Sequence, residues 1–360
     1  MLDLGGGGAE KVLVNLVNNL DPDKYDITIR TVFGKGVNEK FLKPHVNLSS
    51  LFKGRPFRGN AILQKILSPK LLYKVLVKDK YDIEIAYMFN TPTRALGGST
   101  SKAKKFAWIH SGEMGLGKFR NKKELLNVYK SFDGIAYVSK QAQISFENYV
   151  GFKPKGMVVH NVIEADKIKS LASESLTEIT LDKNKVNLCS VGRFMPEKGY
   201  ERLIKILGRL NSEGISNWHF YLLGTGELED TYKKLIDGEK IKDKFTFLGY
   251  QSNPYKYVKN MDLFVCSSYL EGFSTAVTES IIVETPVLTT ECSGMDEIIG
   301  DSGAGIIVAN NDDDLFKGIK EVLCNTKILE NLSQKVKFHS NSFKKEYSIL
   351  EFENFIYKEN

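Results

Sequence analysis

The chain has 360 residues, of which 42% are apolar and 26% charged, a balance that is ordinary for a globular protein with room for two domains. No apolar run approaches the roughly 18 residues that span a bilayer, and no signal peptide is visible at the N-terminus. The four cysteines are scattered without metal-ligand spacing, which favours reduced thiols. We therefore expect a cytoplasmic protein, with neither a disulfide framework nor a cysteine-based metal site.

Short apolar segments alternate with amphipathic segments along the whole chain, which predicts parallel α/β sheets. In the first half, strands are predicted at 25–33, 82–88, 105–110, 134–139 and 156–161, with helices over 10–20, 63–78 and 122–131. In the second half, strands are predicted at 186–192, 219–224, 244–249, 263–268, 286–290 and 305–308, and helices follow Lys198, Glu227, Ser274, Asp312 and Lys327.

A polar stretch without strand periodicity, residues 163–184, separates the two halves and is interpreted as a linker. The sequence therefore predicts an N-terminal Rossmann-like domain over 1–162 and a C-terminal Rossmann-like domain over 185–340. Residues 341–360 are predicted to form one or two helices.

Four glycines, Gly5–Gly8, come directly before the first predicted helix. Such a turn normally follows a strand, because the strand fixes where the glycines point. Only four residues precede it here, so we expect either that the first strand is missing from this chain or that its start was placed late. The pattern is not GxGxxG, so the dinucleotide fingerprint is not met.

Positive charge is concentrated between residues 35 and 80, where eleven lysines and arginines stand against Glu39 and Asp79. A basic block of this kind favours an anionic partner such as a membrane surface, a lipid phosphate or a nucleic acid. The alternative is a solvated helix face.

The segment 267–280, SSYLEGFSTAVTES, is the strongest local signal. A predicted strand ends, a loop carries Glu271, and a helix begins near Ser274, whose start offers N–H groups and a positive dipole end to a phosphate. Glu279 lies about one turn into that helix, within reach of ribose hydroxyls, while Glu271 lies nearer to whatever the phosphates carry. The alternative is a surface pair and a loop charge.

The segment 190–203, SVGRFMPEKGYERL, places two cations at the carboxyl end of a predicted strand. Ligands of open α/β sheets bind at that edge. Arg193 can grip a diphosphate with two hydrogen bonds and Lys198 can act as a point charge. The alternative is a loop salt bridge with Glu197 or a neighbour.

His110 also follows a predicted strand, and a histidine there is well placed to touch a substrate, although a structural histidine is the alternative. His160 ends another strand beside the linker, where a structural or hinge role is favoured. Asp312–Asp314 matches an Asp-x-Asp pattern, but acidic residues are expected at a helix start. We therefore expect no metal site.

Taken together and in this order, these segments resemble retaining GT-B glycosyltransferases of glycosyltransferase family 4. VGRFMPEKGYERLI, LLGTGELED, SSYLEGFSTAVTES and GMDEIIG each look like family segments, and the resemblance covers nearly the whole chain. It implies two Rossmann-like domains that face a central cleft. The donor nucleotide would bind mostly to the second domain and the acceptor mostly to the first.

Carried over by position, the resemblance implies that Arg193 and Lys198 hold the diphosphate. Glu279 would bind the ribose and Glu271 the hydroxyls of the donor sugar. His110 would contact that sugar near the reacting carbon. The backbone of Phe273, Ser274 and Thr275 would lie near the sugar and phosphate, Gly7 and Gly8 would approach the phosphates, and Gly249 and Tyr250 would flank the base.

The resemblance also implies front-face attack with retained stereochemistry, a UDP-sugar as co-substrate and no metal or other cofactor, because the two cations stabilise the leaving diphosphate. The acceptor would be a glycan or a lipid-linked saccharide in cell-surface polysaccharide synthesis. The segment 62–78 would then serve as an interfacial segment at the inner membrane face, with a core helix as the alternative. Nucleic acid is not expected as a partner.

Three features depart from the family pattern. The first strand is missing, Ser111 follows His110 where aspartate is usual, and Glu284 stands in VETPVL where the family often has glycine before proline. Two other functions remain open, namely a GT-B sugar-nucleotide 2-epimerase and a catalytically inactive GT-B subunit that stabilises a partner.

Overall fold

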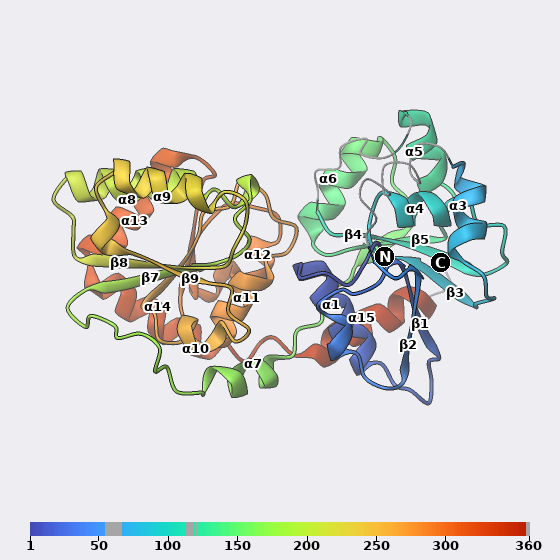
Figure 1. Ribbon diagram of the computed structural model, residues 1–360, viewed down its shortest axis with the longest axis horizontal. Helices are drawn as coiled ribbons and strands as arrows, with labels where there is room; N and C mark the ends of the chain where they lie inside the picture. Colours follow the sequence, from blue (N-terminus) through green and yellow to red (C-terminus); the bar gives the residue numbers. More distant parts are fainter. Residues whose placement is uncertain (55–66, 112–118, 120, 358–360) are drawn as a thin grey trace. The chain divides into compact units, whose positions relative to one another are not determined.

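The computed structural model describes residues 1–54, 67–111, 119 and 121–357. The chain divides into two compact units: unit 1 consists of Met1–Ile163 and Lys345–Asn360, and unit 2 consists of Glu164–Lys344. Figure 1 shows the elements of each unit. Each contains a parallel sheet covered by helices, which confirms the predicted fold class of α/β with two parallel sheets.

Unit 2 is built on a six-stranded parallel sheet in the order β12-β11-β10-β7-β8-β9. Its strands are β7 (Val186–Val191), β8 (Trp218–Leu223), β9 (Phe245–Gly249), β10 (Leu263–Cys266), β11 (Val287–Thr290) and β12 (Gly305–Val308). From β7 the chain builds outward to β8 and β9, and then returns to add β10 on the other side of β7. The strand order therefore reverses between β7 and β10, where open α/β sheets bind ligands.

Helices cover both faces of this sheet. They are α7 (Ala165–Ala172), α8 (Tyr200–Ser212), α9 (Glu229–Gly238), α10 (Tyr255–Val258), α11 (Thr275–Ile282), α12 (Met295–Ile298), α13 (Asp312–Cys324) and α14 (Thr326–His339). In Figure 1, α8, α9 and α13 lie over one face and α10, α11 and α14 over the other.

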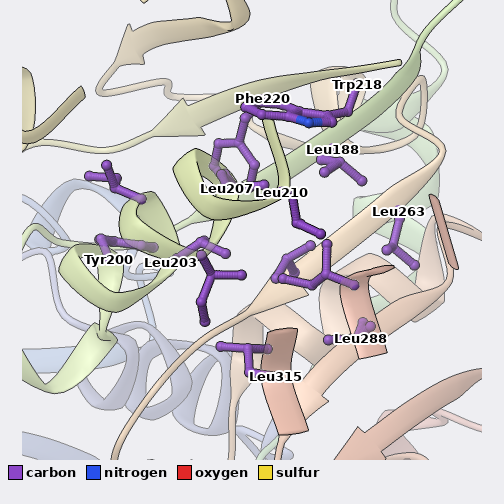
Figure 2. Packing of buried hydrophobic residues seen from close by; sticks show 14 of the residues in the cluster. Leu188, Tyr200, Leu203, Leu207, Leu210, Trp218, Phe220, Leu263, Leu288 and Leu315 are labelled. Carbon is purple, nitrogen blue, oxygen red and sulfur yellow. The ribbon is translucent and has the colours of Figure 1, made fainter. Parts of the chain in front are cut away.

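The core of unit 2 lies between its sheet and α8. Leu203, Leu207 and Leu210 recur at helical spacing on α8 and are almost fully buried. They meet Trp218 and Phe220 of β8, as Figure 2 shows. Close packing of this kind fixes α8 on the sheet, so that the loop before the helix starts from a rigid base.

Unit 1 contains a four-stranded parallel sheet in the order β3-β4-β5-β6 and a parallel pair β1-β2. The strands are β1 (Ile27–Phe33), β2 (Val46–Phe52), β3 (Ile83–Ala86), β4 (Lys104–Ile109), β5 (Gly134–Tyr137) and β6 (Gly156–Val158). The helices are α1 (Gly8–Asn19), α3 (Pro69–Leu76), α4 (Thr91–Leu96), α5 (Lys122–Tyr129), α6 (Lys140–Val150) and α15 (Lys345–Tyr357).

The C-terminal helix α15 packs on β4 of unit 1. The rings of Phe352 and Phe355 lie 6.1 and 4.8 Å from those of Trp108 and Phe106. Glu351 accepts a hydrogen bond from the backbone N–H of His160 and pairs with its Nδ1 at 3.0 Å. His160 therefore ties the end of the first sheet to α15.

Residues 164–184 belong to unit 2, which differs from the prediction of a linker over 163–184. Helix α7 forms within this stretch and packs against α10 and α11. The Asn253 amide also donates to the Leu171 carbonyl oxygen at 2.9 Å, which holds the end of α7 against unit 2. Among the described residues, no helix is long and apolar enough to cross a membrane.

Candidate active site

The carboxyl ends of β7 and β10 meet where the strand order of unit 2 reverses. The loop after β7 carries Arg193 and Lys198, and the loop after β10 carries Glu271. The two segments are joined by backbone contacts, since Tyr269 N–H donates to the Glu197 carbonyl oxygen at 2.8 Å. Because β7 and β10 are neighbours in the sheet, the predicted site segments 190–203 and 267–280 lie side by side although they are far apart in the sequence.

Lys198 is positioned by the packing of its own loop. Phe194 is completely buried against the rings of Tyr200 and Tyr232, which pins the start of the loop. Gly199 then adopts φ +65°, and a Cβ there would lie 2.1 Å from the Ser267 carbonyl oxygen. Only glycine fits this close approach with that backbone conformation, so Gly199 holds Lys198 against the end of β10.

Lys198 and Glu271 form a largely buried ion pair, with Nζ 2.8 Å from Oε1 and the side chains 22% and 12% exposed. Ser268 Oγ donates to the same carboxylate oxygen at 2.7 Å. Burial and the nearby Arg193 guanidinium both lower the pKa of the Lys198 ammonium, but Glu271 outweighs them and the net pKa is raised. Lys198 is therefore a fixed positive charge at neutral pH.

Helix α11 begins beside this pair. The hydroxyl oxygen of its N-cap, Ser274, accepts from Val277 N–H at 3.5 Å. Lys198, Glu271 and Ser274 line one small cavity of about 10 Å³, which has room for about one water molecule. Phe273 precedes the cap, Thr275 is the first residue of α11, and Glu279 follows four residues later on the same helix.

Arg193 is exposed, and its guanidinium makes no ion pair or hydrogen bond within the part of the chain that the structure describes. Arg193 thus makes no salt bridge with Glu197 or a neighbour within the described residues, whereas Lys198 does pair with Glu271 of the adjacent loop. The guanidinium lies close enough to Lys198 to act on its pKa. A free arginine beside a buried lysine leaves cationic capacity for an anionic ligand.

The ends of β8 and β9 extend the same edge of the sheet. Gly224 N–H donates to the Gly249 carbonyl oxygen at 2.8 Å, and Gly192 N–H donates to the Leu223 carbonyl oxygen at 3.0 Å. Tyr250 follows Gly249 and is 73% exposed. Gly249 and Tyr250, the residues predicted to flank the base, therefore lie at the carboxyl end of β9, two strands away from β7 in the sheet.

In unit 1, His110 follows β4, is half-buried and packs near the rings of Tyr87 and Trp108. Its Nε2 lies 2.7 Å from the Tyr87 carbonyl oxygen, and since a carbonyl only accepts, Nε2 carries the proton. Burial lowers the pKa of His110 to about 4, although the Tyr87 carbonyl opposes this effect. The imidazole is therefore neutral near pH 7, and its Nδ1 can accept a hydrogen bond.

Gly7 and Gly8 form the start of α1, with Gly7 as the N-cap. The preceding residues run beside β1 as a strand does: Met1 N donates to the Arg30 carbonyl oxygen at 2.7 Å, and Val32 N–H donates to the Met1 carbonyl oxygen at 3.1 Å. The glycine turn therefore follows a short stretch in strand-like pairing.

Sequence reasoning missed Arg202, which is 3% exposed within the apolar face of α8. Its guanidinium donates to the carbonyl oxygens of Ser267 and Ser268 at 2.6–2.8 Å and stacks 3.9 Å from the centre of the Tyr269 ring. It thereby fixes the loop that leads to Glu271. One feature of the sequence could have indicated it: Arg202 is a charged residue on the otherwise apolar face of a predicted helix, and such residues are rarely buried unless they are paired.

Asp312–Asp314 open α13, where the Asn311 side chain accepts from Asp314 N–H at 2.9 Å. The residues that the structure describes contain no group of three or more His, Cys, Asp or Glu side chains that could hold a metal ion. Asn311 caps the helix, and the three aspartates lie in its first turn, where negative charge is favoured by the helix dipole.

Comparisons with known proteins agree with this architecture. Residues 173–338 match the family model described as "Glycosyl transferases group 1". The N-acetylgalactosamine-N,N'-diacetylbacillosaminyl-diphospho-undecaprenol 4-alpha-N-acetylgalactosaminyltransferase of Campylobacter jejuni is 27% identical, over 95% of this chain and 94% of that protein. The lipopolysaccharide core biosynthesis glycosyltransferase LpsE of Rhizobium meliloti is 23% identical over 91% and 89%. The crystal structure of HepE from Anabaena in complex with UDP superposes with a TM-score of 0.72 at 16% identity, over 98% of this chain and 97% of that one.

The two parallel sheets match the fold of GT-B glycosyltransferase structures. The chain is a glycosyltransferase whose residues 173–338 match the glycosyl transferases group 1, and it is similar to the retaining enzymes of glycosyltransferase family 4. The resemblance seen in the sequence is thereby confirmed.

Proposed function

We propose that this enzyme transfers a sugar from a UDP-sugar to a lipid-linked glycan acceptor in the synthesis of a cell-surface polysaccharide. The observation that carries the proposal is the buried pair of Lys198 and Glu271 at the start of α11. This pair places a fixed cation for a diphosphate beside a carboxylate for sugar hydroxyls. We also propose that the donor binds mostly to the second domain and the acceptor mostly to the first, with the residue roles given below.

The chemistry follows from charge. As the bond between the sugar and the phosphate breaks, negative charge grows on the departing diphosphate, and Lys198, Arg193 and the amino end of α11 stabilise it. The acceptor hydroxyl attacks from the face that the leaving group vacates and gives its proton to a departing phosphate oxygen. The cations would supply the charge that a metal supplies elsewhere, so we propose turnover without a metal.

The residues that bind the donor contact different parts of it. Glu271 accepts hydrogen bonds from hydroxyls of the donor sugar, and Glu279 accepts from the ribose. The neutral imidazole of His110 accepts, through Nδ1, a hydrogen bond that a sugar hydroxyl donates. Tyr250, with Gly249, flanks the base, while Gly7 and Gly8 approach the phosphates. The backbone of Phe273, Ser274 and Thr275 lies near the transferred group.

Two similarities support the choice of substrates. The Campylobacter relative, aligned over nearly its whole length, is named for a diphospho-undecaprenol acceptor, and the Rhizobium relative is named for lipopolysaccharide core biosynthesis. The Anabaena protein with the same fold was crystallised with UDP. A lipid-linked acceptor fits an enzyme that works at the cytoplasmic membrane face.

Exposed apolar side chains beside lysines support membrane association. Phe41 and Phe52 are 52% and 40% exposed, and the Lys40 ammonium lies 5.0 Å from the Phe41 ring centre. Such a mixture suits an anionic lipid surface. Part of the basic block, residues 55–66, and with it part of the predicted interfacial segment 62–78, lies outside the described residues. The described part contains α3, which buries Leu72 and Leu76 in the core of unit 1, as the alternative of a core helix predicts.

The test is a transfer assay with a panel of UDP-sugars and undecaprenyl-diphosphate-linked saccharides, with chelator present. Formation of a longer lipid-linked product that depends on both substrates supports the proposal. Conversion of the donor sugar without any acceptor would instead indicate a 2-epimerase. Failure of UDP to bind would indicate a subunit without catalytic activity.

A further inference from the structure

Arg202 is a buried cation without a close carboxylate partner. It lies on α8 next to Leu203, and its ion-pair partner among the described residues, Asp312, is 3.8 Å away and largely exposed. Removing a guanidinium from water is unfavourable unless its donors find acceptors. An apolar side chain would fill this position on the helix at lower cost. The use of an arginine here therefore directs attention to the groups that accept its hydrogen bonds.

The main acceptors of Arg202 belong to the loop that follows β10. Its Nε and Nη2 donate to the Ser267 carbonyl oxygen at 2.8 and 2.6 Å, and Nη2 also donates to the Ser268 carbonyl oxygen at 2.7 Å. Strand β10 ends at Cys266, so these buried carbonyls depend on side-chain donors. A guanidinium supplies several donors in one rigid plane, whereas a lysine is a single flexible point charge.

Further contacts hold the next residue of this loop. The Arg202 guanidinium lies 3.9 Å from the centre of the Tyr269 ring, and Nη2 donates to Asn310 Oδ1 at 2.9 Å. The Asn310 amide donates in turn to the Tyr269 carbonyl oxygen at 3.0 Å. Three consecutive carbonyls, from Ser267 to Tyr269, are thus held by Arg202 and Asn310. The backbone shortly before Glu271 is therefore fixed by side chains that lie far away in the sequence.

Ser268 connects this fixed backbone to the Glu271 carboxylate. Its carbonyl oxygen accepts from Arg202, and its hydroxyl donates to Glu271 Oε1 at 2.7 Å. The Lys198 ammonium donates to the same oxygen at 2.8 Å. Within the described residues, the other oxygen of Glu271, Oε2, receives no hydrogen bond. Its lone pairs are therefore available to a ligand.

We infer that Arg202 is a positioning residue for recognition of the donor sugar, which acts through Ser268 to hold Glu271 so that Oε2 alone accepts from the sugar hydroxyls. The inference rests on the function proposed above. It adds to that function which oxygen of Glu271 binds the sugar and which side chain fixes its place. Preorganisation of this kind lowers the cost of ordering the carboxylate when the sugar binds.

The inference separates the sugar from the diphosphate. UDP without a sugar does not use Glu271 Oε2, because Lys198 and Arg193 bind its diphosphate in the proposed function. The loop that carries both cations is pinned by the buried ring of Phe194 against Tyr200. Loss of Arg202 should therefore weaken the binding of a UDP-sugar more than the binding of UDP.

The test is calorimetric titration of the full chain with UDP and with four donors: UDP-glucose, UDP-galactose, UDP-N-acetylglucosamine and UDP-N-acetylgalactosamine. The readout is the ratio of the affinity for the best-bound UDP-sugar to the affinity for UDP. Arg202→Met is compared with Arg209→Met, a control on the same helix whose guanidinium is stacked 3.8 Å from the Phe316 ring centre but is half exposed and paired with Glu213.

Two milder variants give the same readout if Arg202→Met does not fold. Arg202→Lys keeps the positive charge without the planar set of donors. Ser268→Ala removes only the hydroxyl that donates to Glu271 Oε1 and leaves the carbonyl that Arg202 binds. The melting temperature of every variant is recorded beside the two affinities.

We expect Arg202→Met and Ser268→Ala to lower the ratio by about tenfold and Arg202→Lys to lower it by less, while the affinity for UDP changes by less than about threefold. Arg209→Met should change neither value. The inference is overturned if the affinities for UDP and UDP-sugar fall together, or if only the melting temperature falls, which would leave Arg202 a purely structural residue. Failure of the unmodified protein to bind any of the four UDP-sugars would contradict the proposed function itself, and the inference with it.

Discussion

The Lys198 ammonium lies 2.8 Å from the Glu271 carboxylate, across the point where β7 and β10 diverge into separate loops. In the function that we propose, a donor diphosphate that binds Lys198 shares it with Glu271. On that proposal, the ion pair holds both side chains in place before the donor binds, so that little reorganisation is needed during the reaction. It also makes the two residues energetically dependent on each other.

That dependence is measurable as a double-mutant cycle. Lys198→Met and Glu271→Gln each leave a largely buried group without its partner, so each should lower the free energy of unfolding of unit 2 by about 1–3 kcal/mol. The double variant should lose less than the sum of the two. Urea denaturation gives the three values, and strict additivity would show that the pair contributes no coupling. Turnover should fall by roughly a hundredfold or more in either variant.

Arg193 should affect the ligand and not the fold. Its guanidinium is exposed and makes no ion pair among the described residues, so Arg193→Ala should leave the melting temperature unchanged. Affinity for UDP should fall by roughly tenfold to a hundredfold, the effect of losing a charge-assisted contact. Lys205→Ala, an exposed cation on α8, is the matched control and should change neither value. Equal losses of affinity in both variants would assign the effect to general surface charge.

Gly199 should be intolerant of a side chain. With φ +65° and a Cβ that would lie 2.1 Å from the Ser267 carbonyl oxygen, Gly199→Ala should destabilise unit 2 by at least about 1–2 kcal/mol and displace Lys198. Gly238→Ala is the control, because its Cβ meets nothing within 4 Å, and it should be neutral or slightly stabilising. Thermal unfolding compares the two. If Gly199→Ala melted at the same temperature as the unmodified protein, the strained backbone and close contact described for Gly199 would be contradicted.

Glu284 is a site where a change should improve stability. It follows α11 with φ +69°, a left-handed conformation that glycine adopts without strain. This explains in physical terms why glycine would suit the position at which the sequence departs from the family pattern. Glu284→Gly should raise the free energy of unfolding by about 0.5–1 kcal/mol. A decrease would show that the Glu284 side chain contributes contacts that outweigh its backbone strain.

His110 should stay neutral over the working pH range. Its pKa is lowered to about 4, whereas an unfolded chain has a histidine pKa of about 6.5. Between these values the unfolded state binds the proton more tightly, so this residue makes stability increase as pH rises from about 4 to about 6.5. In NMR spectra, the His110 ring signal, assigned with His110→Asn, should not shift between about pH 5.5 and 8. A midpoint near 6.5 would contradict its burial.

Much of the fold was predictable because alternating apolar segments directly reflect parallel strands. Every strand predicted from the sequence overlaps an observed strand. Strand β2 was not predicted, since VNLSSLF has a short apolar pattern broken by two serines. Helix α7 was interpreted as linker because the stretch 163–184 around it is mostly polar, and only the packing of α7 against α10 and α11 shows that it belongs to unit 2.

The residues of the candidate site could be predicted from the sequence, but the ion pair between two of them could not. Lys198 and Glu271 were each identified from a local pattern, yet nothing local indicates that they form one ion pair, because their contact depends on β7 and β10 being neighbours. Arg202 was missed for the same reason: its partners are the carbonyl oxygens of a distant loop. Non-local backbone acceptors leave no trace in a single sequence.

Calorimetric titration with UDP, on the unmodified protein and on Lys198→Ala, addresses the central claim that the edge of the sheet between β7 and β10 holds the donor diphosphate. We predict one binding site per chain in the unmodified protein and at least a tenfold weaker affinity in the variant, whose folding is checked by circular dichroism. Equal affinity in the two folded proteins would place the diphosphate elsewhere and contradict the account.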